Sequence, residues 1–156
     1  MPIDKVLEKA SAIGLVVMWV ITYNVFFKLP NMIPIHFNGS GKADNYGDRF
    51  TLLLLPIMAT VLYLSITYLN KFPHIFNYGV TITETNAEKQ YRLVMRLLRF
   101  AKLSIVILFT IIIAEVYFTV KGSIVGLGWW FLPFTLALFI VPTFWMIFHS
   151  YSKKNR

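Results

Sequence analysis

The chain has 156 residues, of which 57% are hydrophobic and 17% aromatic, and its formal net charge is +8. Four long apolar stretches occupy most of this length and leave no room for a separate soluble domain. The absence of cysteine excludes a disulfide framework, a thiolate metal site and a cysteine nucleophile. A charge of +8 suggests nucleic acid in a soluble protein, but here the basic residues flank apolar stretches, so we expect no nucleic acid partner.

The apolar stretches predict four membrane-spanning helices, over residues 11–27, 51–69, 103–120 and 129–149. Each is almost free of charge and roughly long enough to cross ~30 Å of hydrocarbon at ~1.5 Å per residue. No small-residue cleavage site follows a short apolar core near the N-terminus, so we interpret the first stretch as a retained span. The expected fold is all-α, an integral membrane four-helix bundle forming a single membrane domain over residues 1–156.

The distribution of Lys and Arg predicts how this bundle is oriented. Eleven of the fifteen lie in the N-terminal segment, in the connection 70–102 and in the tail with Lys153, Lys154 and Arg156. Because short basic loops stay on the cytoplasmic side, both termini and this connection are expected inside. Residues 28–50 and the short turn 121–128 are then extracytoplasmic.

The outer loop, residues 28–50, is dense in Gly, Asn and Asp, which favour turns. A loop of this length is usually functional or unstructured. Apolar residues such as Ile33, Phe37 and Tyr46 argue for contact with the bundle. We therefore expect an ordered loop without obvious secondary structure.

The inner connection predicts a basic amphipathic helix that runs into the third span. Thr85 and Glu88 have the spacing of a capping box at its start. Basic residues at three- and four-residue steps share one face, and apolar residues share the other. The basic face is expected to contact anionic lipid headgroups and comprises Lys89, Arg92, Arg96 and Arg99. A surface for a regulatory partner is the less favoured interpretation.

Glu115 is the one acid inside the four apolar stretches, about five residues from the outer end of the third. A carboxylate in hydrocarbon is costly, so it should face the bundle interior, have a partner or be protonated. Asn24 lies at a similar depth. The pair, together with loop groups, predicts a site for a proton, cation or substrate. A structural acid that locks helix packing is an equally favoured alternative.

His36, with Asp44 and Asp48, offers nitrogen and oxygen ligands for a divalent metal, but the spacing matches no known metal motif. A hydrogen-bonded loop histidine is the favoured interpretation. Ser40 has no evident base, so a nucleophilic site is unsupported. We expect no cofactor, no metal and no catalytic residue.

Residues 29–38 read Leu-Pro-Asn-Met-Ile-Pro-Ile-His-Phe-Asn, and further Gly, Asp and Gly residues precede a span that begins with four leucines and a proline. This pattern resembles the N-terminal membrane domain of SdpI-type immunity proteins, the domain-of-unknown-function 1648 family, over about residues 11–69. The chain departs from it at Asn31, where Asp is usual, and at Asp48 and Arg49. The resemblance implies signature positions at Pro34, His36, Phe37, Asn38, Gly41, Asp44 and Gly47.

The resemblance further implies a multi-pass protein of the bacterial cell (inner) membrane that binds, or protects from, a secreted membrane-active peptide toxin. A regulator protein inside and membrane lipids are the other implied partners, and the chain is compatible with an oligomer. We expect a non-enzymatic role in toxin immunity, envelope stress or signal reception through the outer loop. Two alternatives stay open: a small oligomeric transporter or channel subunit using Glu115, and a metal-dependent membrane enzyme.

Overall fold

The computed structural model describes residues 2–151, so the predicted basic tail of Lys153, Lys154 and Arg156 lies outside the described part. Four helices within this range are long and apolar enough to cross a membrane, which confirms the predicted membrane fold. In chain order the elements are α1 (Pro2–Phe26), β1 (Met32–Phe37), β2 (Ala43–Asp48), the 3₁₀ helix η1 (Arg49–Leu53), α2 (Leu54–Leu69), the 3₁₀ helix η2 (Pro73–Ile75), α3 (Ala87–Val120) and α4 (Phe131–Tyr151).

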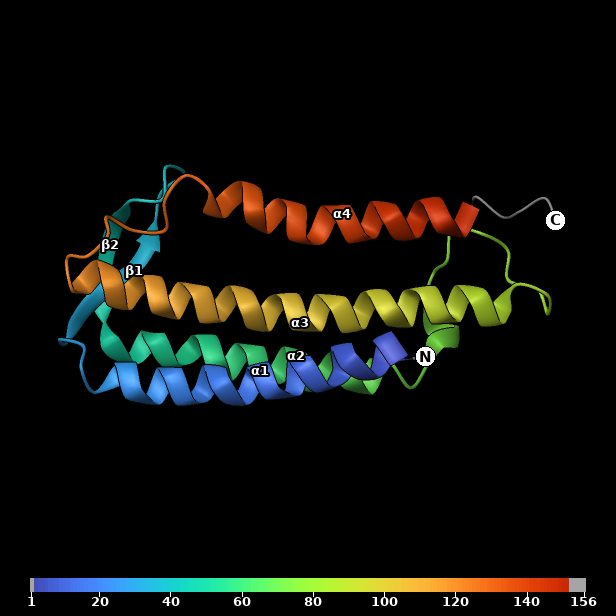
Figure 1. Ribbon diagram of the computed structural model, residues 1–156, viewed down its shortest axis with the longest axis horizontal. Helices are drawn as coiled ribbons and strands as arrows, with labels where there is room; N and C mark the ends of the chain where they lie inside the picture. Colours follow the sequence, from blue (N-terminus) through green and yellow to red (C-terminus); the bar gives the residue numbers. More distant parts are fainter. Residues whose placement is uncertain (1, 152–156) are drawn as a thin grey trace.

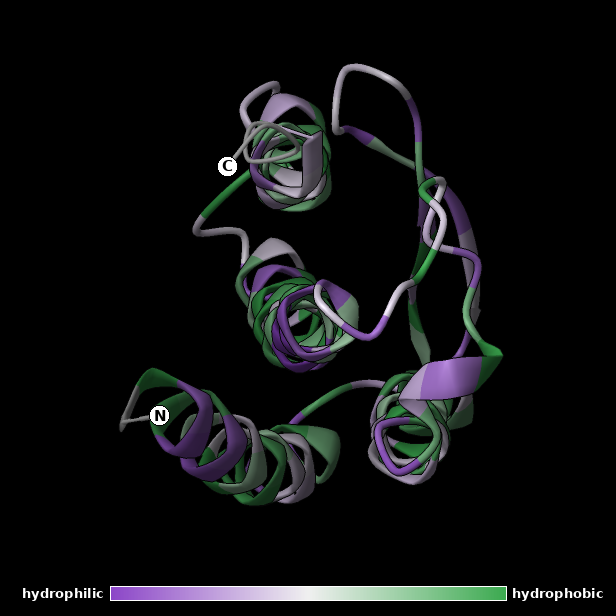
Figure 2. Cartoon of the chain, turned by 90° about the vertical axis from the view of Figure 1, so that its right-hand side faces the viewer, coloured by the Kyte–Doolittle hydropathy of each residue, from purple (hydrophilic) through white to green (hydrophobic). Residues whose placement is uncertain are grey.

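The four long helices lie along one common direction, with both ends of the described chain at one end of the molecule and the strands at the other (Figure 1). We call these the basic end and the hairpin end. Viewed along the helices, α3 lies between α4 on one side and α1 and α2 on the other (Figure 2). Helix α3 is therefore the central helix, which contacts each of the other three.

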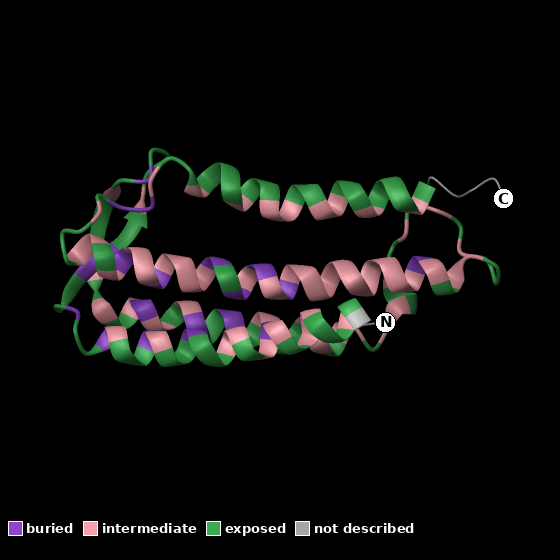
Figure 3. Ribbon diagram, viewed as in Figure 1, coloured by how far each residue is buried: buried purple, intermediate pink, exposed green. Residues whose placement is uncertain are grey.

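The core lies among α1, α2, α3 and the start of β1. It is a cluster of buried apolar residues: Met18, Leu29, Ile33, Leu52, Ala59, Ile113 and Val116. Figure 3 shows buried residues on α1, α2 and α3, whereas α4 is intermediate or exposed along its length. The outward side chains of α4 are mainly apolar, as expected of a helix that faces lipid.

Helix α3 has 34 residues, about 51 Å at 1.5 Å per residue, which exceeds the ~30 Å of a hydrocarbon core. The predicted continuity of the basic helix with the third span is thus confirmed. Its predicted capping box is wrong, because the helix begins one residue after Asn86 and receives no side-chain cap. Asn86 instead bonds backward to Thr83 N and Thr81 O, and Glu88 pairs with Arg92.

The outer loop folds into an antiparallel β-hairpin, which the sequence did not predict. Met32 pairs with Asp48, Ile33 with Gly47 and Pro34 with Tyr46, and the register becomes irregular near His36. The second strand, Ala-Asp-Asn-Tyr-Gly-Asp, is poor in the β-branched residues that signal strands. Burial of Ile33 in the core places β1 on the bundle, and β2 pairs with it.

Candidate functional site

The tip of the hairpin is organised by one asparagine side chain. The Oδ1 atom of Asn38 accepts hydrogen bonds from Ser40 N at 3.0 Å, Ser40 Oγ at 2.7 Å and Lys42 N at 3.1 Å. The backbone closes the same turn, because Asn38 N donates to Lys42 O at 2.9 Å. Gly41 has φ +78°, a conformation that residues with a Cβ rarely adopt. Two signature positions, Asn38 and Gly41, therefore shape this turn.

The hairpin tip is joined to the turn between α3 and α4. Lys42 forms an isolated antiparallel bridge with Gly126. A Cβ at Gly41 would lie 2.5 Å from Gly128 N, and a Cβ at Gly126 would collide with Gly41 O. The two backbones approach this closely because glycine has no side chain. We call the unit of β1, β2 and residues 121–130 the outer cap.

Three further signature positions hold the hairpin in place. Pro34 is buried, and Phe37 packs against the core cluster near Gly126. A Cβ at Gly47 would lie 2.7 Å from Ile35 Cδ1, so glycine leaves room for that side chain. These positions are explained by packing.

The two remaining signature residues meet on the surface. His36 Nδ1 lies 2.5 Å from Asp44 Oδ1, and the side chains are 65% and 40% exposed. Asp48 does not join them, because its carboxylate accepts from Phe50 N at 2.8 Å and caps η1. Across residues 2–151 no group of three or more His, Cys, Asp and Glu side chains is placed to hold a metal ion. The pair is a polar, accessible feature of the hairpin surface.

Glu115 lines a pocket of about 470 Å³ at the hairpin end, which we call the outer pocket. Lys42 and Trp129 line it as well. Asn24, the predicted neighbour of Glu115, is absent from this lining. Its exposed side chain donates to Val20 O at 2.7 Å on its own helix. The structure thus brings loop groups to Glu115 and leaves Asn24 apart.

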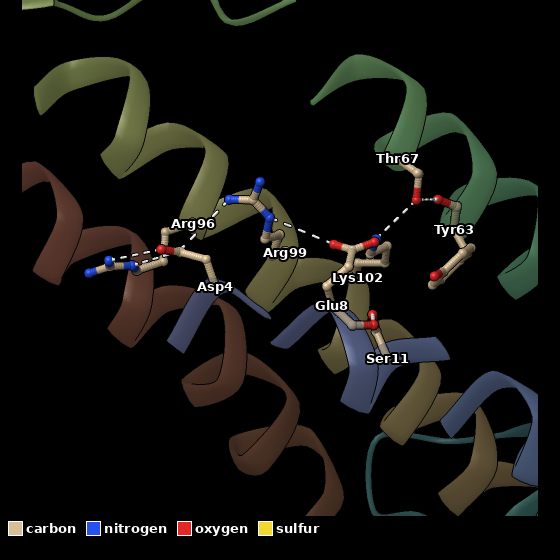
Figure 4. A network of polar contacts seen from close by, with 8 residues as sticks. All are labelled: Asp4, Glu8, Ser11, Tyr63, Thr67, Arg96, Arg99 and Lys102. Carbon is tan, nitrogen blue, oxygen red and sulfur yellow. Dashed lines mark hydrogen bonds and ion pairs between the residues drawn. The ribbon is translucent and has the colours of Figure 1, made fainter. Parts of the chain in front are cut away.

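The basic end contains a charged cluster around the buried Lys102 that sequence reasoning missed (Figure 4). The side chain of Lys102 is fully buried, and its Nζ lies 2.5 Å from Glu8 Oε1 and 2.9 Å from Thr67 Oγ1. The same ammonium lies 4.3 Å from the centroid of the Tyr63 ring. Lys102 therefore connects α3 to both α1 and α2.

Two of the four residues predicted to contact headgroups take part in this cluster. Arg96 Nε lies 3.1 Å from Asp4 Oδ1, and Arg99 lies 3.8 Å from Asp4 and 3.6 Å from Glu8. A signal for this cluster was present in the sequence. The acids of the N-terminal helix, Asp4 and Glu8, are four residues apart, and the bases of α3 that they face recur every three residues, at Arg96, Arg99 and Lys102. The same helix also carries Lys89 and Arg92, for which headgroup contact stays a prediction.

Comparison with known proteins supports the resemblance for the first part of the chain. A family model described as "Domain of unknown function (DUF1648)" matches residues 13–60, which comprise most of α1, the hairpin and the start of α2. A protein of Archaeoglobus fulgidus named "Uncharacterized protein" is 28% identical over 81 residues. The match spans 47% of this chain and 44% of the relative, less than half of either. No solved structure matches the chain.

Proposed function

We propose that this multi-pass membrane protein is a non-enzymatic receptor for a secreted membrane-active peptide, acting in immunity to that peptide or in reception of its signal. The observation that supports this most is that the segment matching the family model, residues 13–60, contains the outer hairpin. Its signature residues converge on a folded hairpin outside the helices. Five of them hold the hairpin in shape, and His36 and Asp44 remain accessible on it.

The surface of the hairpin suits a peptide partner. Met32, Ile35 and Tyr46 are exposed apolar side chains on the two strands. The sheet has two strands, so each has one edge outside the pairing. An extended peptide can add to such an edge, and an amphipathic one can cover the apolar side chains. Both kinds of contact are available to peptides that lie at a membrane surface.

The His36–Asp44 pair is better suited to recognise a partner than to stabilise the fold. An exposed ion pair of this kind contributes only about 0–1 kcal/mol to folding, because water screens it and the side chains lose freedom. A polar pair with so little structural value is well suited to contact a partner.

In this proposal the protein has the orientation that the distribution of Lys and Arg predicts, with the hairpin end outside the cell and the basic end in the cytoplasm. A bacterial cell membrane and a cytoplasmic regulator are parts of the same proposal. Helix α3 contacts β1 at one end and contributes Lys89 and Arg92 to the basic end, so it is one continuous element between the two faces.

The main alternative is an oligomeric transporter or channel subunit that uses Glu115. Between Glu115 and Lys102 the interior is filled by Met18, Ala59 and Ile113, each fully buried. This packing favours a receptor over a pore through one copy. The metal-dependent enzyme has less support, because neither Asp48 nor Glu115 joins His36 and Asp44 in a group of three metal-binding side chains within residues 2–151.

The test is survival of a deletion strain challenged with secreted membrane-active peptides and complemented with variants. Wild type and Glu88→Ala, which removes an exposed ion pair at the basic end, should both protect. His36→Ala and Asp44→Ala should lose protection at equal membrane abundance. Full protection by both hairpin variants would refute the assignment of the hairpin, and sensitivity unaffected by deletion would refute the immunity role.

A further inference from the structure

We propose that the outer pocket binds the zwitterionic headgroup of an aminophospholipid, with the ammonium on Glu115 and the phosphate on Lys42. Both residues line the pocket of about 470 Å³. Neither the Glu115 carboxylate nor the Lys42 ammonium forms a hydrogen bond or ion pair with any residue from 2 to 151. The pocket therefore presents one negative and one positive group, both available to a ligand.

The depth of the pocket matches the position of lipid headgroups. Glu115 lies five residues before Val120, where α3 ends. This separation is about 7.5 Å along the helix, comparable to the thickness of one headgroup layer. Trp129 and Trp130 line the same pocket, and tryptophan is enriched at this level of a membrane. In the orientation proposed above, a lipid headgroup is the ligand available at this depth.

The pocket is held open by the backbone of the outer cap. The backbone of Lys42 is fixed by its bridge to Gly126 and by the bond from its N–H to Asn38 Oδ1. Glu115 projects from α3, and the two charges come from separate, firmly placed elements. The indole N–H groups of Trp129 and Trp130 form no hydrogen bond within residues 2–151, so they can donate to phosphate or ester oxygens.

The charge pattern selects among headgroups. An ammonium with N–H donors gives Glu115 a charge-assisted hydrogen bond, and the adjacent phosphate meets Lys42. A phosphatidylglycerol headgroup satisfies Lys42 but leaves a partly buried carboxylate without a cation, which is unfavourable. A choline headgroup has the positive charge but lacks the N–H donors. Phosphatidylethanolamine is therefore the expected ligand.

The experiment uses the purified full-length chain in nanodiscs of mixed phosphatidylethanolamine, phosphatidylcholine and phosphatidylglycerol. Native mass spectrometry then identifies the lipid that stays bound. Wild type should retain phosphatidylethanolamine about tenfold over phosphatidylglycerol, the factor for one charge-assisted hydrogen bond of ordinary strength. Glu115→Gln should abolish this preference. Lys42→Gln should weaken retention of both lipids, and Glu88→Gln on the exposed basic end of α3 should behave as wild type.

Each outcome decides the proposal. Equal retention of the two lipids by wild type, or an unchanged preference in Glu115→Gln, would overturn it. A Glu115→Gln variant that unfolds is replaced by Lys42→Gln, whose side chain is exposed at the hairpin tip, and unchanged retention there would equally overturn it. Soluble phosphoethanolamine tests the other source of the same chemistry: it should bind more weakly than the lipid, and tighter binding of the soluble compound would refute a membrane source.

Discussion

Removal of the Glu8 carboxylate should destabilise the protein by leaving a positive charge buried. In Glu8→Gln, the Lys102 ammonium keeps Thr67 Oγ1 at 2.9 Å and the Tyr63 ring at 4.3 Å, but it loses its anion. Breaking a fully buried pair costs about 3–5 kcal/mol. The side chain of Glu8 is 39% exposed and a glutamine oxygen can still accept a hydrogen bond, so we expect about 2 kcal/mol, a factor of about 30 in the unfolding equilibrium.

The matched variant removes the cation instead. Lys102→Met keeps a long side chain in the same space, and Glu8 retains Arg99 at 3.6 Å and contact with solvent. Its expected cost is only about 0–1 kcal/mol, and Glu8→Gln/Lys102→Met should resemble it rather than the sum of the two. Reversible unfolding in mixed detergent, followed by circular dichroism, measures all three. The reasoning is refuted if Lys102→Met costs as much as Glu8→Gln, or if Glu8→Gln stays within about 0.5 kcal/mol of wild type.

Two further substitutions test the outer cap and the connection between α2 and α3. Gly41→Ala should lower the unfolding free energy by at least about 2 kcal/mol, because φ is +78° and the new Cβ meets the backbone of Gly128. Gly39→Ala, whose Cβ meets nothing within 4 Å, is the control, and equal melting temperatures would contradict the predicted contact. Burial, and secondarily Tyr91, raises the pKa of the Tyr78 phenol, which donates to Pro73 O. Its contribution is therefore complete below about pH 10 and is lost as pH rises through the folded-state pKa. Tyr78→Phe should flatten the alkaline part of the stability curve, and an unchanged slope above about pH 10 would argue against this assignment.

Hydropathy along the chain was enough to predict the four helices and their approximate bounds. A stretch of about twenty residues almost free of charge has few structural options, because its backbone must satisfy its own hydrogen bonds in lipid. The same local reasoning predicted that the basic helix continues into the third span. The family pattern of the outer loop was likewise legible, because Pro34, His36 and Asn38 stand in a fixed order along the chain.

Pairings between distant residues depend on how the helices and the hairpin pack, which no local pattern in the chain predicts. The strand Ala43–Asp48 has no strong propensity of its own and exists because Ile33 anchors its partner in the core. Glu115 lines a pocket with Lys42 rather than with Asn24, because the cap bridges two turns more than eighty residues apart. Hydropathy measures how a residue interacts with solvent, whereas a site depends on which side chains the packed helices bring together.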